Sequence, residues 1–260
     1  MSDQSTPSGL PSAYRTALVT GASRGIGAAI CSELVGLGLE VHAIARNVRD
    51  LDRLRGALDV VTHPLDITDT SALQGLCADL QVDVLVNNAG QVAALGSMEA
   101  LEADAIDRMI DVNLRAPLQL IRLLLPGMLQ RGHGHIINIG STTGSFVFPG
   151  TAPYAAAKAG MSAAGRVMRH DLAGRNIRIT EISPGRVRTG IYREAVKDAQ
   201  QLSGMYEDVR TVHPEDIARC VVHALCLPEQ VDISFMEVSP TDQAPGGHAY
   251  TSPSDSPGTD

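Results

Sequence analysis

A tyrosine and a lysine stand four residues apart in the segment YAAAK, residues 154–158, which has a helical pattern. On a helix, this spacing places the side chains of Tyr154 and Lys158 on one face. An ammonium group beside a phenol favours the phenolate, so we expect the pKa of Tyr154 to fall from its usual value of about 10 toward neutral pH. The pair therefore predicts a general acid or base.

Ser141 lies thirteen residues before Tyr154 and directly follows an apolar run that is typical of a buried strand. The carboxyl ends of parallel strands form the ligand-binding edge of an open α/β sheet. We therefore expect the Ser141 hydroxyl to hold and polarise a substrate oxygen. The alternative is an ordinary Ser/Thr-rich loop, because Thr142, Thr143 and Ser145 follow. The spacing to Tyr154 favours the functional interpretation.

Three glycines, Gly21, Gly25 and Gly27, follow a predicted strand and open a predicted helix in the segment TGASRGIG, residues 20–27. We expect Gly21 to permit a tight turn, Gly25 to let the backbone approach a pyrophosphate and Gly27 to let the helix pack on the strand. Three glycines can also simply form a turn, and the G-x3-G-x-G spacing differs from G-x-G-x-x-G. The strand and helix on either side favour a dinucleotide site.

The end of the second predicted strand indicates which dinucleotide is bound. An acidic residue there would bind the ribose 2′-hydroxyl of NAD, but this strand ends in Arg46, and Arg24 lies in the glycine turn. Two guanidinium groups suit a 2′-phosphate, so the sequence predicts NADP(H). The alternative is two solvated surface arginines. Asp66, after the third strand, is either an adenine contact or a helix N-cap with Thr68 and Asp69.

Short apolar runs alternate with helix-period segments along the chain, which predicts a doubly wound, seven-stranded parallel sheet with helices on both faces, a single-domain Rossmann α/β fold. The expected strands are residues 16–19, 40–45, 60–65, 82–86, 135–139, 178–182 and 231–238. The expected helices are residues 26–38, 48–58, 69–80, 99–130, 154–174 and 214–227. Residues 1–13 and 241–260 read as flexible tails of the 14–240 domain. The segment 185–213 reads as a substrate loop.

The composition of the 260 residues excludes several classes of protein. With 44% hydrophobic residues the chain is not disordered throughout, and a net charge of −8 disfavours a nucleic-acid partner. No apolar run approaches the roughly 20 residues that span a bilayer, and no secretory signal is visible, so we expect a cytoplasmic protein. We expect no disulfide and no metal, and we interpret His133 and His135 as loop histidines.

The motifs in their fixed order resemble the short-chain dehydrogenase/reductase family over about residues 16–240. The motifs are TGASRGIG, the NNAG of residues 87–90, Asn113, Ser141, YAAAK and Pro184-Gly185. The resemblance implies a catalytic set of Asn113, Ser141, Tyr154 and Lys158, in which Lys158 also bonds the nicotinamide ribose and Asn113 holds a water that links Lys158 to solvent. Asn113 also stands within a helical pattern, where asparagine is unfavourable, which predicts a local distortion.

The expected cofactor contacts come from the glycine turn, the ends of the strands and the catalytic helix. They are Gly21, Ser23, Arg24, Gly25, Ile26, Gly27, Arg46, Asp66, Ile67, Asn88, Ala89, Gly90, Tyr154, Lys158, Pro184, Gly185, Val187 and Thr189. The resemblance also implies a homodimer or homotetramer that assembles through the helices at 99–130 and 154–174.

These residues predict hydride transfer between NADP(H) and a carbonyl or alcohol, in the direction of reduction, with Tyr154 moving the proton. A looser resemblance, to hydroxy-acid and serine-type dehydrogenases and aldehyde reductases, implies a small polar substrate. We expect an apolar wall of Phe146, Phe148, Ile191, Tyr192 and Met205, near Arg186, Arg188 and Arg193, which are either a carboxylate partner or solvated loop charges. The alternatives are a non-catalytic NADPH-binding regulator and a nucleotide-sugar dehydratase or epimerase.

Overall fold

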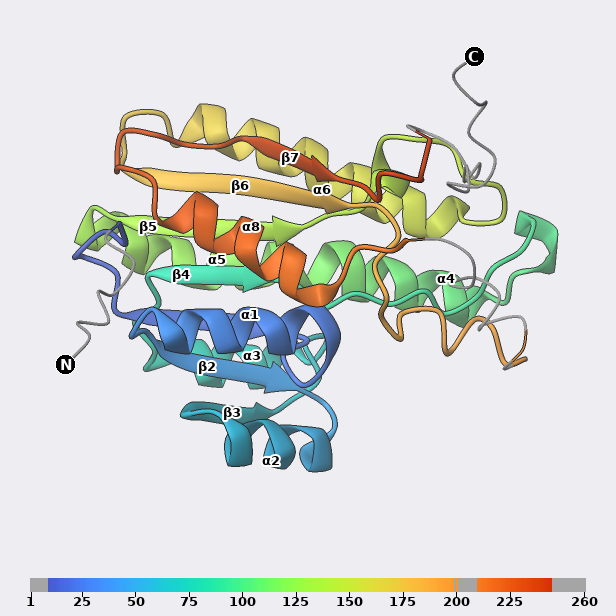
Figure 1. Cartoon of the computed structure of the whole chain (residues 1–260), viewed down its shortest axis with the longest axis horizontal. Coiled ribbons are helices and arrows are strands. Elements are labelled where there is room, and N and C mark those ends of the chain that lie inside the picture. The colour runs from blue at the N-terminus through green and yellow to red at the C-terminus, as the bar shows by residue number, and fades with distance from the viewer. Residues whose placement is uncertain (1–8, 199, 201–209, 245–260) are drawn as a thin grey trace, which may run out of the picture.

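The computed structural model describes residues 9–198, 200 and 210–244. Seven parallel strands form one sheet in the order β3-β2-β1-β4-β5-β6-β7, which confirms the predicted fold class. All the carboxyl ends of the strands therefore lie at one edge, on the right in Figure 1. The strands are β1 (Thr16–Thr20), β2 (Glu40–Ala45), β3 (Val60–Pro64), β4 (Val84–Asn87), β5 (Gly134–Ile139), β6 (Ile177–Pro184) and β7 (Phe235–Val238).

Helices cover both faces of the sheet (Figure 1). One face carries α1 (Gly25–Gly36), α2 (Val48–Ala57) and α8 (Pro214–Leu225). The other carries α3 (Thr70–Ala78), α5 (Ala116–Arg131) and α6 (Ala152–Asp171). The strands pack apolar side chains on both faces, which is why they read as continuous hydrophobic runs and not as alternating ones.

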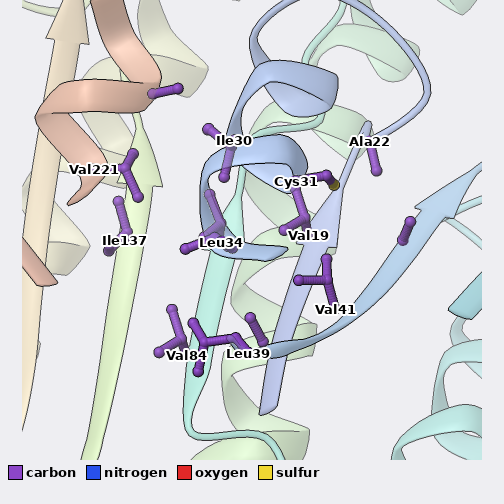
Figure 2. Packing of buried hydrophobic residues seen from close by; sticks show 14 of the residues in the cluster. Val19, Ala22, Ile30, Cys31, Leu34, Leu39, Val41, Val84, Ile137 and Val221 are labelled. Carbon is purple, nitrogen blue, oxygen red and sulfur yellow. The ribbon is translucent and has the colours of Figure 1, made fainter. Parts of the chain in front are cut away.

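The core under α1 shows how this burial is achieved (Figure 2). Ile30 and Leu34 of α1 lie over Val19 of β1 and Val84 of β4, and all four are fully buried. Residues 30 and 34 are one helical turn apart, so both point toward the sheet. This packing holds the beginning of α1 directly behind the end of β1.

The predicted helix at 99–130 is wrong as a single element. The chain forms a 3-10 turn η1 (Met98–Ala100), then α4 (Ala103–Ile110), a π-helical turn η2 (Asp111–Arg115) and α5. The Asn113 side chain donates to the carbonyl of Met109 at 2.8 Å and to that of Gln91 at 2.8 Å. A π turn adds one residue to the helical repeat, which turns the side chain at 113 toward the sheet.

Both predicted tails are shorter than the composition indicated. Leu10 packs against the α1 side of the core, so the chain is already docked by residue 10, within the segment predicted to be flexible. At the other end, Asp242 is buried and forms an ion pair with Arg210 at 2.5 Å. The tail boundaries are predicted from Pro, Gly and Ser content. This content does not reveal the two contacts, because each contact is made by an isolated residue and not by a periodic pattern.

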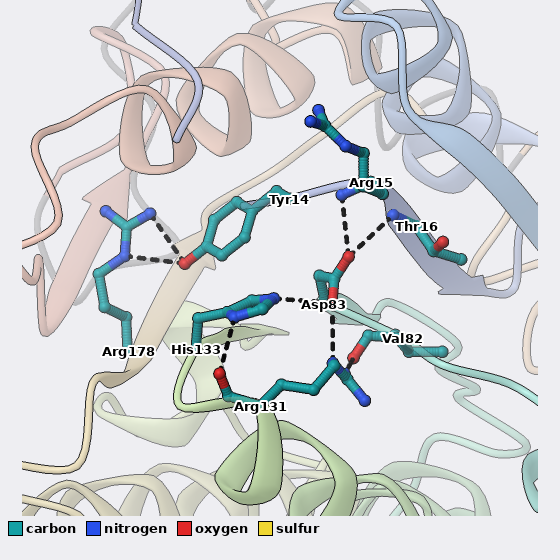
Figure 3. A network of polar contacts seen from close by, with 8 residues as sticks. All are labelled: Tyr14, Arg15, Thr16, Val82, Asp83, Arg131, His133 and Arg178. Atoms are coloured by element: carbon teal, nitrogen blue, oxygen red, sulfur yellow. Dashed lines mark hydrogen bonds and ion pairs between the residues drawn. The ribbon is translucent and has the colours of Figure 1, made fainter. Parts of the chain in front are cut away.

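The amino ends of the strands carry a polar network (Figure 3). Asp83 accepts hydrogen bonds from the backbone N–H groups of Arg15 and Thr16 at 2.8 and 3.2 Å, and Arg131 lies 3.3 Å from its carboxylate. His133, predicted as a loop histidine, joins this network at 3.2 Å from Asp83. The network links the chain before β1 to the beginning of β4 and to the end of α5.

His135 is not a loop histidine, because it is fully buried in β5. Its Nε2 lies 2.8 Å from the Thr180 hydroxyl, and burial holds its pKa well below the usual value. Among the described residues, no group of His, Cys, Asp and Glu side chains is arranged to hold a metal ion. Nor is any helix in this part of the chain long and apolar enough to cross a membrane.

Arg178 is a buried cation, and its partners are a hydroxyl and backbone carbonyls. Its guanidinium donates to the Tyr14 hydroxyl at 3.2 and 3.3 Å and to the carbonyls of Ala224 and Leu225 at the end of α8. The negative end of the α8 dipole and these carbonyls together stabilise the charge.

Replacing Arg178 with methionine leaves several buried acceptors without a donor. We expect Arg178→Met to lower the free energy of unfolding by about 2–4 kcal/mol, measured by urea denaturation. The exposed Arg55→Met is the control and should change it by less than about 0.5 kcal/mol. Equal stability of the two variants would contradict this role of Arg178.

Candidate functional site

A cavity of about 420 Å³ opens at the carboxyl edge of the sheet, between the glycine turn, the ends of β2 to β6 and the loop after β6. Every site residue predicted from the sequence lines this cavity, except Gly27 and Asn113. Further lining residues that the prediction missed include Asn47, Asp50, Gln91, Val112 and Glu194. The sheet topology explains the convergence, because parallel strands bring their carboxyl ends together.

The glycine turn requires glycine for two different reasons. Gly21 has a φ of 63°, and Gly25 has a φ of 55°, a conformation that side chains with a Cβ rarely adopt. At Gly27, a Cβ would lie 2.2 Å from the carbonyl oxygen of Gly21, so the first turn of α1 touches the end of β1 directly. Gly27 therefore serves helix packing and does not line the cavity.

The NNAG segment holds the glycine turn from behind. The Asn88 side chain donates to the carbonyls of Thr20 and Gly21 at 2.9 and 3.2 Å. The Thr20 hydroxyl accepts from the backbone N–H groups of Asn88 and Ala89 at 3.1 and 3.0 Å. These bonds tie the end of β4 to the end of β1 and leave the N–H groups at the beginning of α1 facing the cavity side.

Arg24 and Arg46 lie on the same cavity, and both are exposed. Arg46 lies 3.9 Å from the carboxylate of Asp66 and 3.7 Å from that of Glu194 in the loop after β6. Asp66 is not a helix N-cap: it accepts from the Thr68 backbone N–H at 2.9 Å, whereas Asp69 caps α3. Asp66 thus lies in the cavity wall, and Glu194 is a site residue without any sequence motif.

Tyr154, Ser141 and Lys158 meet at the inner end of the cavity. Tyr154 and Lys158 are buried, and Tyr154 and Ser141 line the same end of the cavity, where Ser141 lowers the pKa of Tyr154. The Lys158 ammonium group donates to the carbonyl of Ile139 at 2.8 Å and lies 5.8 Å from the centre of the Tyr154 ring. Ser141 follows β5 directly and accepts from the backbone N–H of Thr143 at 3.2 Å, which orients its hydroxyl.

The predicted fall in the pKa of Tyr154 is wrong for this structure. Burial raises it above the usual value, the neighbouring Tyr192 raises it further, and only the hydrogen bond with Ser141 lowers it. Burial also lowers the pKa of Lys158 to about 8. Desolvation disfavours both charged forms, and it outweighs the attraction between them.

Asn113 lies behind the cavity, in the π turn. Its amide bonds both backbone groups of Gln91, donating to the carbonyl at 2.8 Å and accepting from the N–H at 3.2 Å. A second cavity of about 10 Å³, roughly the volume that one water needs, has a mostly apolar lining that also includes Asn87, Asn113, Asn138 and Lys158. The predicted helix distortion at Asn113 is therefore present, and it places the residue beside Lys158.

The apolar wall near Tyr154 differs from the prediction. Ile191 and Tyr192 line the cavity and pack with Val92 and Met109 around Tyr154, whereas Phe146 and Phe148 do not line it. Of the three arginines, Arg186 lines the cavity, and Arg188 and Arg193 do not. Met205 lies outside the described residues. The segment after β4 supplies Val92, which no strand or helix pattern marked as a site residue.

The shape and charge of the cavity fit an elongated dinucleotide with a phosphorylated ribose. The beginning of α1 offers N–H groups to an anion at the centre, and Arg24 and Arg46 offer cationic groups at the end formed by β2. Tyr154, Ser141 and Lys158 stand at the other end.

Comparison with known proteins supports this interpretation. Residues 15–200 match the family model described as short chain dehydrogenase. The chain is 43% identical over 234 residues to an uncharacterized short-chain type dehydrogenase/reductase, y4eK, of Sinorhizobium fredii, covering 90% of this chain and 94% of the relative. It is 36% identical to the NADP-dependent 3-hydroxy acid dehydrogenase YdfG of Salmonella typhi, covering 88% and 96%.

Solved structures agree in fold. The closed form of serine dehydrogenase complexed with NADP+ superposes with a TM-score of 0.86 at 33% identity, covering 89% of this chain and 97% of that one. The motifs, the seven-stranded sheet and these matches lead to one conclusion. The chain belongs to the short-chain dehydrogenase/reductase family.

Proposed function

We propose that this protein is an NADP(H)-dependent oxidoreductase that transfers a hydride between the nicotinamide and a carbonyl or alcohol, and that it reduces a small polar ketone or aldehyde or oxidises a hydroxy acid. One observation carries the proposal: Tyr154, one turn from Lys158, shares a cavity with Ser141 and with the glycine turn. An acid, a polarising hydroxyl and a dinucleotide cradle are what carbonyl reduction requires.

Ser141, Tyr154, Lys158 and Asn113 have separate roles in the proposed reaction. The bound nicotinamide supplies the hydride chemistry. Ser141 holds the substrate oxygen, and the Tyr154 hydroxyl donates a proton to that oxygen in reduction or removes it in oxidation. The Lys158 ammonium group, fixed by the Ile139 carbonyl, stabilises the phenolate form of Tyr154 and orients the cofactor ribose. Asn113, through a water in the small cavity that it shares with Lys158, links Lys158 to solvent for proton exchange.

The choice of cofactor and of substrate class is inferred from the charged side chains of the cavity. Arg24 and Arg46 hold the 2′-phosphate, the glycine turn and the beginning of α1 hold the pyrophosphate, and Pro184, Gly185, Val187 and Thr189 flank the nicotinamide. Arg186, in the wall beside Tyr192, offers a cation to a substrate carboxylate. The names of the relatives, a 3-hydroxy acid dehydrogenase and a serine dehydrogenase, support substrates that carry a carboxylate.

We further propose that the protein acts in the cytoplasm and assembles as a homodimer or homotetramer. Assembly through α5 and α6 follows from the family resemblance. The domain predicted over residues 14–240 extends to the contacts of Leu10 and Asp242, and residues 185–213 serve as the substrate loop.

Tyr154→Phe tests the proposed acid. Because it removes the proton donor and little volume, we expect reduction of a panel of aldehydes, ketones and keto acids to fall by about 100-fold or more, followed as NADPH absorbance. NADPH binding, measured by fluorescence, should persist. Tyr14→Phe, which alters a phenol at the opposite edge of the sheet, should keep activity within about threefold.

Full activity of Tyr154→Phe would refute the role of the phenol. NADPH binding by the unmodified protein, without turnover of any compound in the panel, would instead favour the non-catalytic regulator.

Arg46→Ala tests the preference for NADP(H). Loss of a charge-assisted bond to the 2′-phosphate should weaken NADPH binding by about 10- to 100-fold, with NADH affinity changing by less than about threefold. Calorimetric titration of both dinucleotides measures this difference. Arg55→Ala on the surface of α2 serves as the control. Equal losses for the two dinucleotides would contradict the proposed phosphate contact.

A further inference from the structure

A carboxylate that the catalytic motifs do not include lies behind the end of β5. Glu181 of β6 is paired in register with Asn138 of β5. Alternate residues of a strand point to the same face. Glu181 therefore shares its face with Ile177 and Ile179, which pack on the side of α5 and α6. Helix α6, which carries Lys158, packs on that face of the sheet.

Gly140 shows how closely the carboxylate approaches the catalytic segment. A Cβ on Gly140 would lie 2.5 Å from the Oε1 atom of Glu181, so a larger residue at position 140 would displace this carboxylate. Gly140 stands between Ile139, whose carbonyl accepts the bond from Lys158, and Ser141. Its N–H donates to the carbonyl of Ile182 at 2.8 Å, which fixes the segment against β6.

Helix α6 and the elements that pack against it carry other titratable or charged groups. They are Tyr154, Arg166, Arg169 and His170 on α6, Asp104, Asp107 and Arg108 on α4, Asp111 and Arg115 on η2, Arg178 on β6, and Arg186, Tyr192 and Glu194 in the loop after β6.

Most of these charges have their own partners. Arg115 pairs with Asp111, Arg169 with Asp232, and Glu194 with Arg46. Arg178 points to the opposite face, toward Tyr14. Tyr192 and Arg186 line the outer part of the cavity. The Glu181 carboxylate approaches Gly140, next to the Ile139 carbonyl that binds Lys158, and it raises the pKa of Lys158.

We propose that Glu181 is a positioning residue for the reaction: its carboxylate, packed on Gly140, keeps the Lys158 ammonium group charged inside the protein. The inference rests on the proposed function for its catalytic consequence, but the interaction between the two charges stands without it. A buried ammonium group is costly, and an opposite charge nearby offsets part of this cost. Neutral Lys158 would neither stabilise the Tyr154 phenolate nor return a proton to Tyr154, and loss of Glu181 increases this neutral fraction.

Because the pKa of Lys158 is about 8, this contribution has its largest effect on the charge of Lys158 near pH 8. Burial lowers this pKa to about 8, and the charge of Glu181 opposes that fall. A group with a pKa of about 8 is half protonated at pH 8. A further fall of about 0.5 unit would leave about a quarter protonated at that pH. A modest change at Glu181 therefore alters the charge of Lys158 in the range where enzymes work.

The chain offers a direct readout, because it has two lysines, Lys158 and Lys197. We would label lysine with ¹³C at Cε and follow both resonances by NMR from pH 6 to 10.5 in the full-length protein without added cofactor. A Lys197→Arg variant assigns the Lys158 resonance. Glu181→Gln removes the charge and nearly preserves the shape.

We expect Glu181→Gln to lower the titration midpoint of Lys158 by about 0.5 unit or more. Glu237→Gln is the matched control, since it removes the same charge from the neighbouring strand β7 and should leave the midpoint unchanged. An identical Lys158 midpoint in Glu181→Gln and the unmodified protein would overturn the proposal, because a purely structural Glu181 would not move it.

A second variant covers a failure of Glu181→Gln to fold. Glu181→Asp withdraws the carboxylate by one methylene group, and we expect a midpoint between those of the unmodified protein and the glutamine variant. If only the aspartate variant folds, an unchanged midpoint in it overturns the proposal.

Enzyme kinetics separate this inference from the proposed function. With an active substrate, the alkaline limb of kcat for reduction should move to lower pH in Glu181→Gln, with about a twofold loss at pH 8 and little change in KM. A shifted Lys158 midpoint with no turnover of any carbonyl would leave the charge pairing intact and refute the reductase. Turnover with an unshifted Lys158 midpoint and an unshifted pH profile would refute the role of Glu181 and leave the reductase intact.

Discussion

The hydrogen bond from the Lys158 ammonium group to the carbonyl of Ile139 joins the catalytic helix to the sheet. It is 2.8 Å long and fully buried, and it fixes α6 across the end of β5. Tyr154, one turn earlier on α6, is thereby placed beside Ser141, which follows β5. A buried ammonium group needs such partners, because desolvation otherwise removes its charge. The position of this one charge therefore determines both the geometry and the proton chemistry of the site.

A second constraint operates at the other end of the cavity. The glycine turn brings α1 so close to β1 that a Cβ at Gly27 would lie 2.2 Å from the Gly21 carbonyl. Asn88 then binds this turn from the end of β4. Close packing and hydrogen bonds, including those of the Asn88 side chain, thus set the shape of the glycine turn. Arg24 and Arg46 lie exposed on the same cavity.

The irregular segments contribute as much as the regular ones. The π turn at Asn113 interrupts a long helical pattern, and the loop after β6 carries Glu194 to Arg46, a residue that precedes it by more than a hundred positions. The π turn places Asn113 behind the cavity beside Lys158, and the loop brings Glu194 into the cavity wall. The site therefore depends on local departures from ideal geometry that the rigid sheet supports.

The amino-acid sequence by itself determined the seven-stranded fold and the residues of the glycine turn, the Tyr154–Lys158 pair and Arg46, because periodicity, glycine spacing and one-turn spacing are local properties of a chain. It also indicated the distortion at Asn113, from one asparagine in a helical pattern. Only the tertiary structure decided the direction of the Tyr154 pKa, the approach of Glu181 to Gly140 and the pairing of Glu194 with Arg46. These depend on burial and on contacts between residues far apart in the chain, and neither leaves a periodic signal.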